Sequence, residues 1–188
     1  MLGTHAASAV SSRRLARSVD RALESLEPRR LLATLPAGFN ADTAYGGNFA
    51  NGTAMDFSPD GRLWATTQNG NVFVIQPGGA PATLALTLAV DSFFERGLLG
   101  IAFDPAFNAT APGTDYVYLY YTVPAAQGGP YNNISRFEVS GDTIVAGTRT
   151  EIFRFNQLSA GNHNGGAIHF GTDGMLYAAH GENAVSSN

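Results

Sequence analysis

Short apolar runs separated by turn residues follow one another along the chain from Thr34 onward. The turn Ser58-Pro59-Asp60-Gly61 lies between two such runs, and there Pro fixes φ at about −65° while Gly accepts the positive φ that closes the bend. The pair Asn69-Gly70 lies between the next two runs and is typical of a hairpin. The pattern therefore predicts four short strands, at residues 55–57, 63–66, 72–75 and 84–90.

The same order of strands then returns. A second set is predicted at residues 99–105, 116–123, 134–139 and 150–155, and a third set begins at 166–181. Phe57, Phe103 and Phe170 mark the same point in the three successive units. Repeated units of four strands and about 40–50 residues are typical of a β-propeller. The sequence therefore predicts an all-β fold, a partial β-propeller of about two and a half blades.

A propeller blade cannot bury both of its faces alone, and even a small ring needs at least about four blades. The predicted strands supply fewer than that, so the sequence is interpreted as a fragment of a longer protein or as a truncated chain. Two exposed blade edges and an unclosed core are expected, and such edges favour aggregation.

Residues 1–33 have a different character, because apolar residues there recur at helical spacing. The stripe consists of Leu15, Val19, Leu23 and Leu26. Pro28 should end the helix, and no apolar run long enough for a secretory signal peptide is present. A disordered basic tail remains the alternative to a helix, and targeting of the mitochondrial type is a weaker one.

The stretch 26–33, LEPRRLLA, resembles the LEPR-x-LL signature found near the N-termini of exported bacterial proteins. That resemblance implies an extracellular or periplasmic protein. We therefore expect two parts, a basic export-type segment at 1–33, helical or disordered, and an incomplete propeller at 34–188.

Composition excludes several kinds of site and partner. The net charge of −4 gives no reason to expect a nucleic-acid partner, and six of the eleven basic residues lie within 1–33. The chain has no cysteine, which excludes disulfides, thiolate metal sites and a cysteine nucleophile. No run of about 18 apolar residues predicts a membrane span.

The stretch NHNGG, residues 162–166, carries the most informative chemistry. It places His163 at the beginning of a predicted strand, and imidazole titrates near neutral pH, so it can act as a base. Asn162 and Asn164 can hold the ring or bond to substrate oxygens without adding charge. Gly165 and Gly166 are expected to leave room for a flat cofactor or a sugar and to let the backbone bend sharply.

Several stretches together, in this order, resemble the glucose/sorbosone dehydrogenase family, soluble sugar dehydrogenases that use pyrroloquinoline quinone (PQQ). They are ERGLLGIAFDP (95–105), YVYLYYT (116–122), NNISRF (132–137) and NHNGGAIHFGTDGMLYAAHGEN (162–183). The resemblance covers roughly residues 38–183 and implies a six-bladed propeller with the cofactor over its central channel. It also implies that His163 is the general base on the sugar's C1 hydroxyl, with hydride transfer from C1 to PQQ.

Other site residues follow from the same resemblance. Glu95 stands where related proteins contact the sugar, with a surface carboxylate paired to a neighbouring loop as the alternative. Asn162 departs from the Asp common in the family, which weakens support for an imidazolium. Glu182 is expected to stabilise a turn. From their places in the predicted strands, His169 is expected to be a packing residue and His180 to lie at a strand end facing the channel.

The sequence contains only some of the residues that the family resemblance implies for binding the cofactor. Gly165 and Gly166 are the predicted cofactor-binding residues, and no metal ligand is predicted here. The resemblance places the cations that hold the quinone's carboxylates, and most Ca²⁺ ligands, in later blades. We therefore expect no turnover from the 188-residue chain alone. The pattern favours no particular sugar or electron acceptor.

Two other functions fit the fold. The first is a non-catalytic extracellular propeller that binds a protein or glycan partner. The second is a lactonase-like hydrolase using a metal-bound water, which needs several carboxylates converging on one cation. Only Glu95 and Glu182 are candidates for such carboxylates.

Overall fold

The computed structural model describes residues 36–39, 49–78, 81–107 and 115–184. The chain forms two compact units, residues 1–41 and 42–188. The first is described only at 36–39, a turn in which the Phe39 N–H donates to the Pro36 carbonyl at 3.1 Å. The helical stripe and the export-type stretch predicted within residues 1–33 lie outside the described residues.

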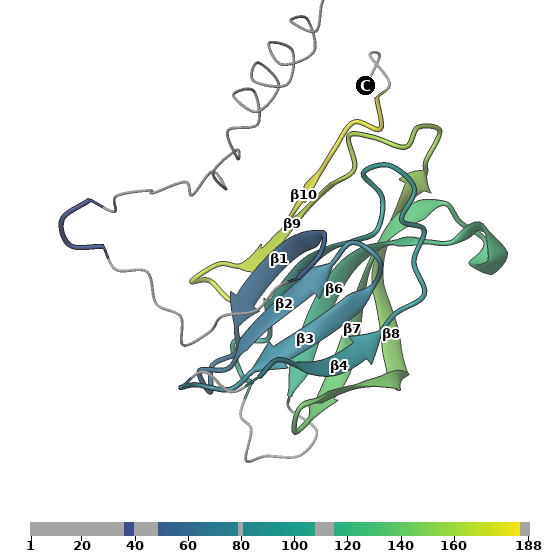
Figure 1. Ribbon diagram of the computed structural model, residues 1–188. Coiled ribbons are helices and arrows are strands. Elements are labelled where there is room, and N and C mark those ends of the chain that lie inside the picture. Colours follow the sequence, from purple (N-terminus) through teal and green to yellow (C-terminus); the bar gives the residue numbers. More distant parts are fainter. Residues whose placement is uncertain (1–35, 40–48, 79–80, 108–114, 185–188) are drawn as a thin grey trace, which may run out of the picture. The chain divides into compact units, whose positions relative to one another are not determined.

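The second unit consists of antiparallel sheets whose strands follow chain order (Figure 1). The first sheet contains β1 (Gly52–Phe57), β2 (Leu63–Thr67), β3 (Asn71–Ile75) and β4 (Thr83–Thr87). The second contains β5 (Leu98–Phe103), β6 (Tyr116–Val123), β7 (Tyr131–Ser140) and β8 (Thr143–Gln157). The third contains β9 (Gly165–Phe170) and β10 (Leu176–His180). Within the described ranges the one helical element is a 3-10 turn, Ala125–Gln127.

Every strand predicted from the apolar pattern is present, and the largest difference in length is at β8. β8 begins at Thr143, although the apolar pattern placed its start at Thr150. In its first half Ile144 is buried but most other residues are exposed, and the strand pairs with β7 through irregular register. Hydrophobic periodicity cannot detect a strand that buries so little of itself.

The predicted internal repeat is confirmed at its turns. Phe57, Phe103 and Phe170 are the last residues of β1, β5 and β9, the first strands of the three sheets. After β1, Gly61 has a φ of +86° and its N–H donates to the Ser58 carbonyl at 2.8 Å. After β9, Gly174 has a φ of +76° and closes the equivalent turn on Gly171 at 3.0 Å.

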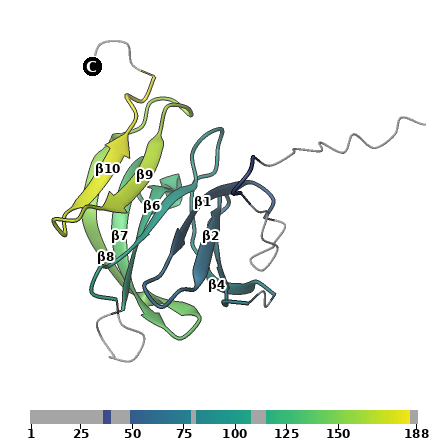
Figure 2. The same ribbon diagram turned by 90° about the vertical axis from the view of Figure 1, so that its left-hand side faces the viewer.

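Neighbouring sheets pack face to face in the order of the chain (Figure 2). One cluster between the first and second sheets includes Trp64, Val74, Leu119 and Phe137. A second cluster joins the second sheet to the third through Tyr120, Ile134 and Ile168. Sheets that bury their faces against one another in sequence are the blades of a β-propeller. The described residues thus form two complete blades and the first half of a third, a partial β-propeller.

The first strands of the three sheets are neighbours, since β1 contacts β5 and β5 contacts β9. They line a groove of about 460 Å³. The Thr53 hydroxyl of β1 donates to the Leu98 carbonyl of β5 at 2.7 Å, so these two strands begin at the same end of the groove.

Large apolar side chains are exposed on the first and third sheets. Met55 is 74% exposed and Leu84 is 53% exposed on the first sheet, while Met175 beside β10 is 63% exposed. Surfaces of this kind favour association with other molecules.

Candidate functional site

Three charged or titratable side chains meet where β5 and β9 begin and β10 ends. His163 precedes β9, Glu95 precedes β5, and Glu182 follows β10. The side chains of His163 and Glu182 are 50% and 49% exposed. The structure therefore brings together two residues predicted for the site, His163 and Glu95, and adds Glu182 to them.

Two carboxylates bind His163, one at its backbone N–H and one at its ring. Its backbone N–H donates to Glu95 Oε2 at 2.6 Å, and its Nδ1–H donates to Glu182 Oε1. The loop of Glu95 is fixed in return, because the Glu95 N–H donates to the Gly161 carbonyl at 3.0 Å. With Nδ1 carrying the proton, Nε2 of the neutral ring is the nitrogen that can accept one.

The two carboxylates also shift the titration of the ring. The hydrogen bond that the ring donates to Glu182 is the largest cause of the raised pKa of His163. The negative charge of Glu182 comes next, and the charge of Glu95 adds a smaller contribution of the same sign. The same hydrogen bond lowers the pKa of Glu182. Both groups are accessible to solvent, so water and salt screen the interaction. Glu182 therefore stays ionised while His163 keeps its proton to a higher pH than a free imidazole.

Glu182→Gln should lower the pKa of His163, because an amide offers neither the charge nor the strong acceptor that stabilises the imidazolium. The check is an NMR titration of the His163 ring in both proteins. His180 serves as the internal reference, since its lowered pKa comes from burial and should not change. An unchanged His163 titration would show that the pair does not form in solution.

The two asparagines beside His163 have different surroundings. Asn164 is 2% exposed, its Nδ2 donates to the Gly161 carbonyl at 3.0 Å, and its Oδ1 accepts from Asn132 Nδ2 at 3.3 Å. These contacts make Asn164 a support for the segment that carries His163, and they give no support to a substrate contact. Asn162 is partly buried, and its substrate role stays a prediction.

Gly165 and Gly166 both have positive φ, +70° and +123°. A Cβ on Gly165 would lie 2.6 Å from the Ala179 carbonyl oxygen, and a Cβ on Gly166 would lie 2.5 Å from Leu99 Cβ. The space beside each glycine is thus filled by β10 or β5, so packing explains these residues without a cofactor. A contact of their backbone with a cofactor stays a prediction.

Gly166→Ala should destabilise the fold by about 1–3 kcal/mol, since it adds both a strained φ and a clash with Leu99. Gly147→Ala on β8 is the matched control, because nothing lies within 4 Å of a Cβ there. Urea unfolding of both variants measures the difference. Equal midpoints would contradict the packing argument.

The other two candidate histidines lie elsewhere on the third sheet. His169 is exposed on β9, so the expectation that it packs in the interior is wrong. His180 ends β10 and stacks on Phe155, with ring centroids 4.2 Å apart. Glu182 has more than the predicted turn role, because it is the carboxylate that pairs with His163.

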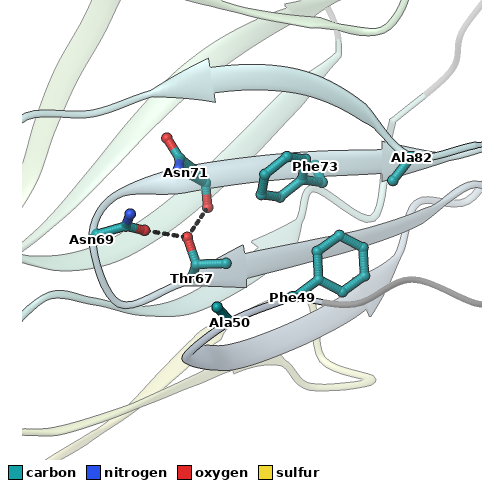
Figure 3. Close-up of a pocket in the computed structure, with 7 residues that line it drawn as sticks. All are labelled: Phe49, Ala50, Thr67, Asn69, Asn71, Phe73 and Ala82. Carbon is teal, nitrogen blue, oxygen red and sulfur yellow. Dashed lines mark hydrogen bonds between the residues drawn. The ribbon is translucent and has the colours of Figure 1, made fainter.

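A pocket of about 340 Å³ lies beside this cluster and is lined in part by Glu182, His180 and Asn183. A larger pocket, of about 480 Å³, lies on the first sheet (Figure 3). Its aromatic side is formed by Phe49 and Phe73, whose rings are 5.2 Å apart, and the Thr67 hydroxyl in it is bonded to Asn69 at 2.5 Å. No acid or base lines this larger pocket, so the cluster around His163 is the better candidate for chemistry.

Two kinds of feature are absent from the described part of the chain. No group of three or more His, Asp or Glu side chains there is arranged to hold a metal ion. No helix in those ranges has the length and apolar character needed to cross a membrane.

Comparison with solved structures identifies relatives of these blades. An oxidoreductase described as a glucose dehydrogenase from Thermus thermophilus is 33% identical with a TM-score of 0.64, over 76% of this chain and 41% of its own. The PQQ-bound aldose sugar dehydrogenase of Streptomyces coelicolor is 27% identical with a TM-score of 0.61, over 77% and 41%. The soluble aldose sugar dehydrogenase of Escherichia coli, in the apo-form, is 25% identical with a TM-score of 0.58, over 71% and 38%.

The chain thus spans about two fifths of the length of these relatives. A sequence profile of the family described as Glucose / Sorbosone dehydrogenase matches residues 49–188, which include all ten strands and the cluster around His163. The chain belongs to the glucose/sorbosone dehydrogenase family.

Proposed function

We propose that a protein containing these blades is a sugar dehydrogenase that oxidises an aldose at C1, with His163 as its general base. The observation that carries the proposal is the pairing of the His163 ring with Glu182. His163 lies two residues before β9, one of the strands that line the groove. Family membership and the aldose sugar dehydrogenases among the relatives give the substrate class.

The geometry suits proton removal from a hydroxyl. With Nδ1–H bound to Glu182, the ring orientation is fixed and Nε2 accepts the proton of the C1 hydroxyl. The charge of Glu182 then stabilises the imidazolium that forms, a task for which the amide of Asn162 is poorly suited. Removing the proton raises electron density at C1 and makes departure of hydride easier.

We propose two roles for Glu95. Its carboxylate accepts the His163 N–H at 2.6 Å, which positions the base. It is also an exposed acceptor close to His163, and we propose that it accepts hydrogen bonds from sugar hydroxyls.

For the hydride acceptor we propose PQQ, because the Streptomyces coelicolor relative is PQQ-bound. We propose Ca²⁺ beside it only on the family resemblance described in the sequence analysis. The described residues around His163 do not fit this group, whose carboxylates need cationic partners. Glu95 and Glu182 are anionic, and the neighbouring Arg96 is paired with Asp91 at 2.9 Å and bonded to the Ala160 carbonyl at 2.7 Å. The described residues around His163 are therefore assigned no part in holding the carboxylates of PQQ, for which the family resemblance implies cations in later blades.

We also propose that the protein is exported, on the strength of the LEPR-x-LL-like stretch at 26–33. Fractionation of cells expressing the chain with and without residues 1–33 tests this. Retention of both forms in the cytoplasm would overturn it.

A chimera tests the dehydrogenase proposal. Residues 49–184 of this chain replace the matching part of the Thermus thermophilus relative. Dye-linked aldose oxidation is then measured with added PQQ and Ca²⁺, and the 188-residue chain alone, for which no turnover is expected, serves as the background. A folded chimera without aldose oxidation, made from an active relative, would overturn the proposal and favour a binding function.

A further inference from the structure

A buried set of polar side chains lies on the second sheet below the segment that carries His163. Tyr120 on β6 and Asn132 on β7 are both 0% exposed, and Asn164 is 2% exposed. Buried polar groups that are fully hydrogen-bonded fix one arrangement of their surroundings, since any other leaves them unpaired.

Two of these side chains converge on one backbone carbonyl. The Asn164 carbonyl accepts from the Tyr120 hydroxyl at 2.8 Å and from Asn132 Nδ2 at 3.2 Å. The amide of Asn132 is itself oriented, because its Oδ1 accepts from the Thr122 hydroxyl at 2.7 Å. The second sheet thus holds the residue that directly follows His163.

The Tyr120 hydroxyl has a second partner, His180 Nδ1, at 3.0 Å. A hydroxyl has one proton to donate, and the Asn164 carbonyl can only accept, so that proton lies between Tyr120 and Asn164. His180 Nδ1 must then be the donor to the Tyr120 oxygen. The geometry therefore requires the His180 tautomer that carries its proton on Nδ1.

His163 needs such support because its φ is +57°, in the left-handed region that a residue with a Cβ adopts at a cost. Glu95 binds its N–H, and the Asn164 side chain binds the Gly161 carbonyl on the other side. The two donors on the Asn164 carbonyl complete the set of contacts that hold the backbone in this conformation.

We propose that Tyr120, with Asn132 and His180, is a positioning group that fixes the backbone after His163 and so keeps its ring against Glu182. This inference rests on the proposed role of His163 as the base, and none of the three residues is assigned contact with the sugar. The set forms a chain of donors from His180 to Tyr120 to the Asn164 carbonyl.

The test is nitrogen NMR of the histidine rings in the 188-residue chain labelled with ¹⁵N-histidine. In the wild type, His180 should show its proton on Nδ1. In Tyr120→Phe it should change to the Nε2 tautomer, and the pKa of His163 should fall from its raised position toward about 6.5. Tyr118→Phe is the control, since Tyr118 lies on the same strand but donates to Asp104 at 3.2 Å and should leave both signals unchanged.

A wild-type His180 with its proton on Nε2 would overturn the inference, and so would an unchanged His163 titration in folded Tyr120→Phe. The tautomer is read in the wild type, so the result does not depend on whether Tyr120→Phe folds. Neither readout uses sugar, cofactor or turnover. Failure of the dehydrogenase proposal appears only in the oxidation assay, and the two failures are therefore distinguishable.

Discussion

His163→Ala in the chimera should lower kcat/KM for aldose oxidation by about 10²–10⁴-fold, the usual contribution of a placed general base. Without the imidazole, solvent must take the proton of the C1 hydroxyl. Because Glu182 raises the pKa of His163, the wild-type rate should rise with pH until the ring loses its proton, above the pH at which a free imidazole does so. In His163→Ala this rise of the rate with pH should be absent.

His169→Ala is the matched control for that experiment. His169 is an exposed histidine on β9; it lines the groove of the first strands but lies outside the cluster of Glu95, His163 and Glu182. It should retain the wild-type rate and pH profile. Equal losses in the two variants would show that His163 has no special part in the reaction, and full activity in His163→Ala would remove it as the base.

The blade repeat could be predicted from the sequence because the first strand of each blade ends in Phe and the first and third blades share the turn that follows. A strand that ends in Phe is followed by a turn closed by a glycine with positive φ, as at Phe57 with Gly61 and Phe170 with Gly174. Such turns depend on residues a few positions apart, which a sequence displays directly. The first half of β8 was missed because it has few buried residues and its pairing with β7 is interrupted by register shifts, so no regular apolar pattern marks it.

The partner of His163 could not be predicted in the same way. Glu182 reaches the ring because β9 and β10 pair with a register shift between Ala178 and His180, which places His180 opposite Gly165. A bulge of this kind moves the residues after it along the partner strand, and the stretch AAHGEN carries no signal for it. The sequence therefore indicated a base and a turn carboxylate, and the pairing between them came from the structure.

The hydrogen bond from the Tyr120 hydroxyl to the Asn164 carbonyl could not be predicted from the sequence either. The rings of Tyr118 and Tyr120 on β6 pack against those of Phe170 and Phe155, with centroids 5.1 Å and 5.4 Å apart. The hydroxyl of Tyr120 has its role only because the third sheet lies against the second. Contacts between sheets depend on residues far apart in the chain, and one sequence does not reveal them.

Trp64→Ala should cause the largest loss of stability, about 3–5 kcal/mol, because this residue joins the first two blades. Its side chain is 0% exposed, and its ring lies 5.3 Å from that of Phe103 on the second sheet. The guanidinium of Arg62 lies 5.1 Å from the ring, and Nε1 donates to the Ser58 hydroxyl at 3.0 Å. Alanine would leave a cavity between the sheets and remove all three contacts.

Such a loss is a large part of the roughly 5–15 kcal/mol that stabilises a typical domain, so Trp64→Ala should unfold at a much lower urea concentration. Trp64→Phe keeps an aromatic ring and removes the N–H, and its smaller loss separates packing from the hydrogen bond to Ser58. Met55→Ala on β1, 74% exposed in the wild type, should change stability by no more than about 0.5 kcal/mol. Equal midpoints for Trp64→Ala and Met55→Ala would mean that the first two sheets do not pack through Trp64, and the blade arrangement derived from that contact would have to be abandoned.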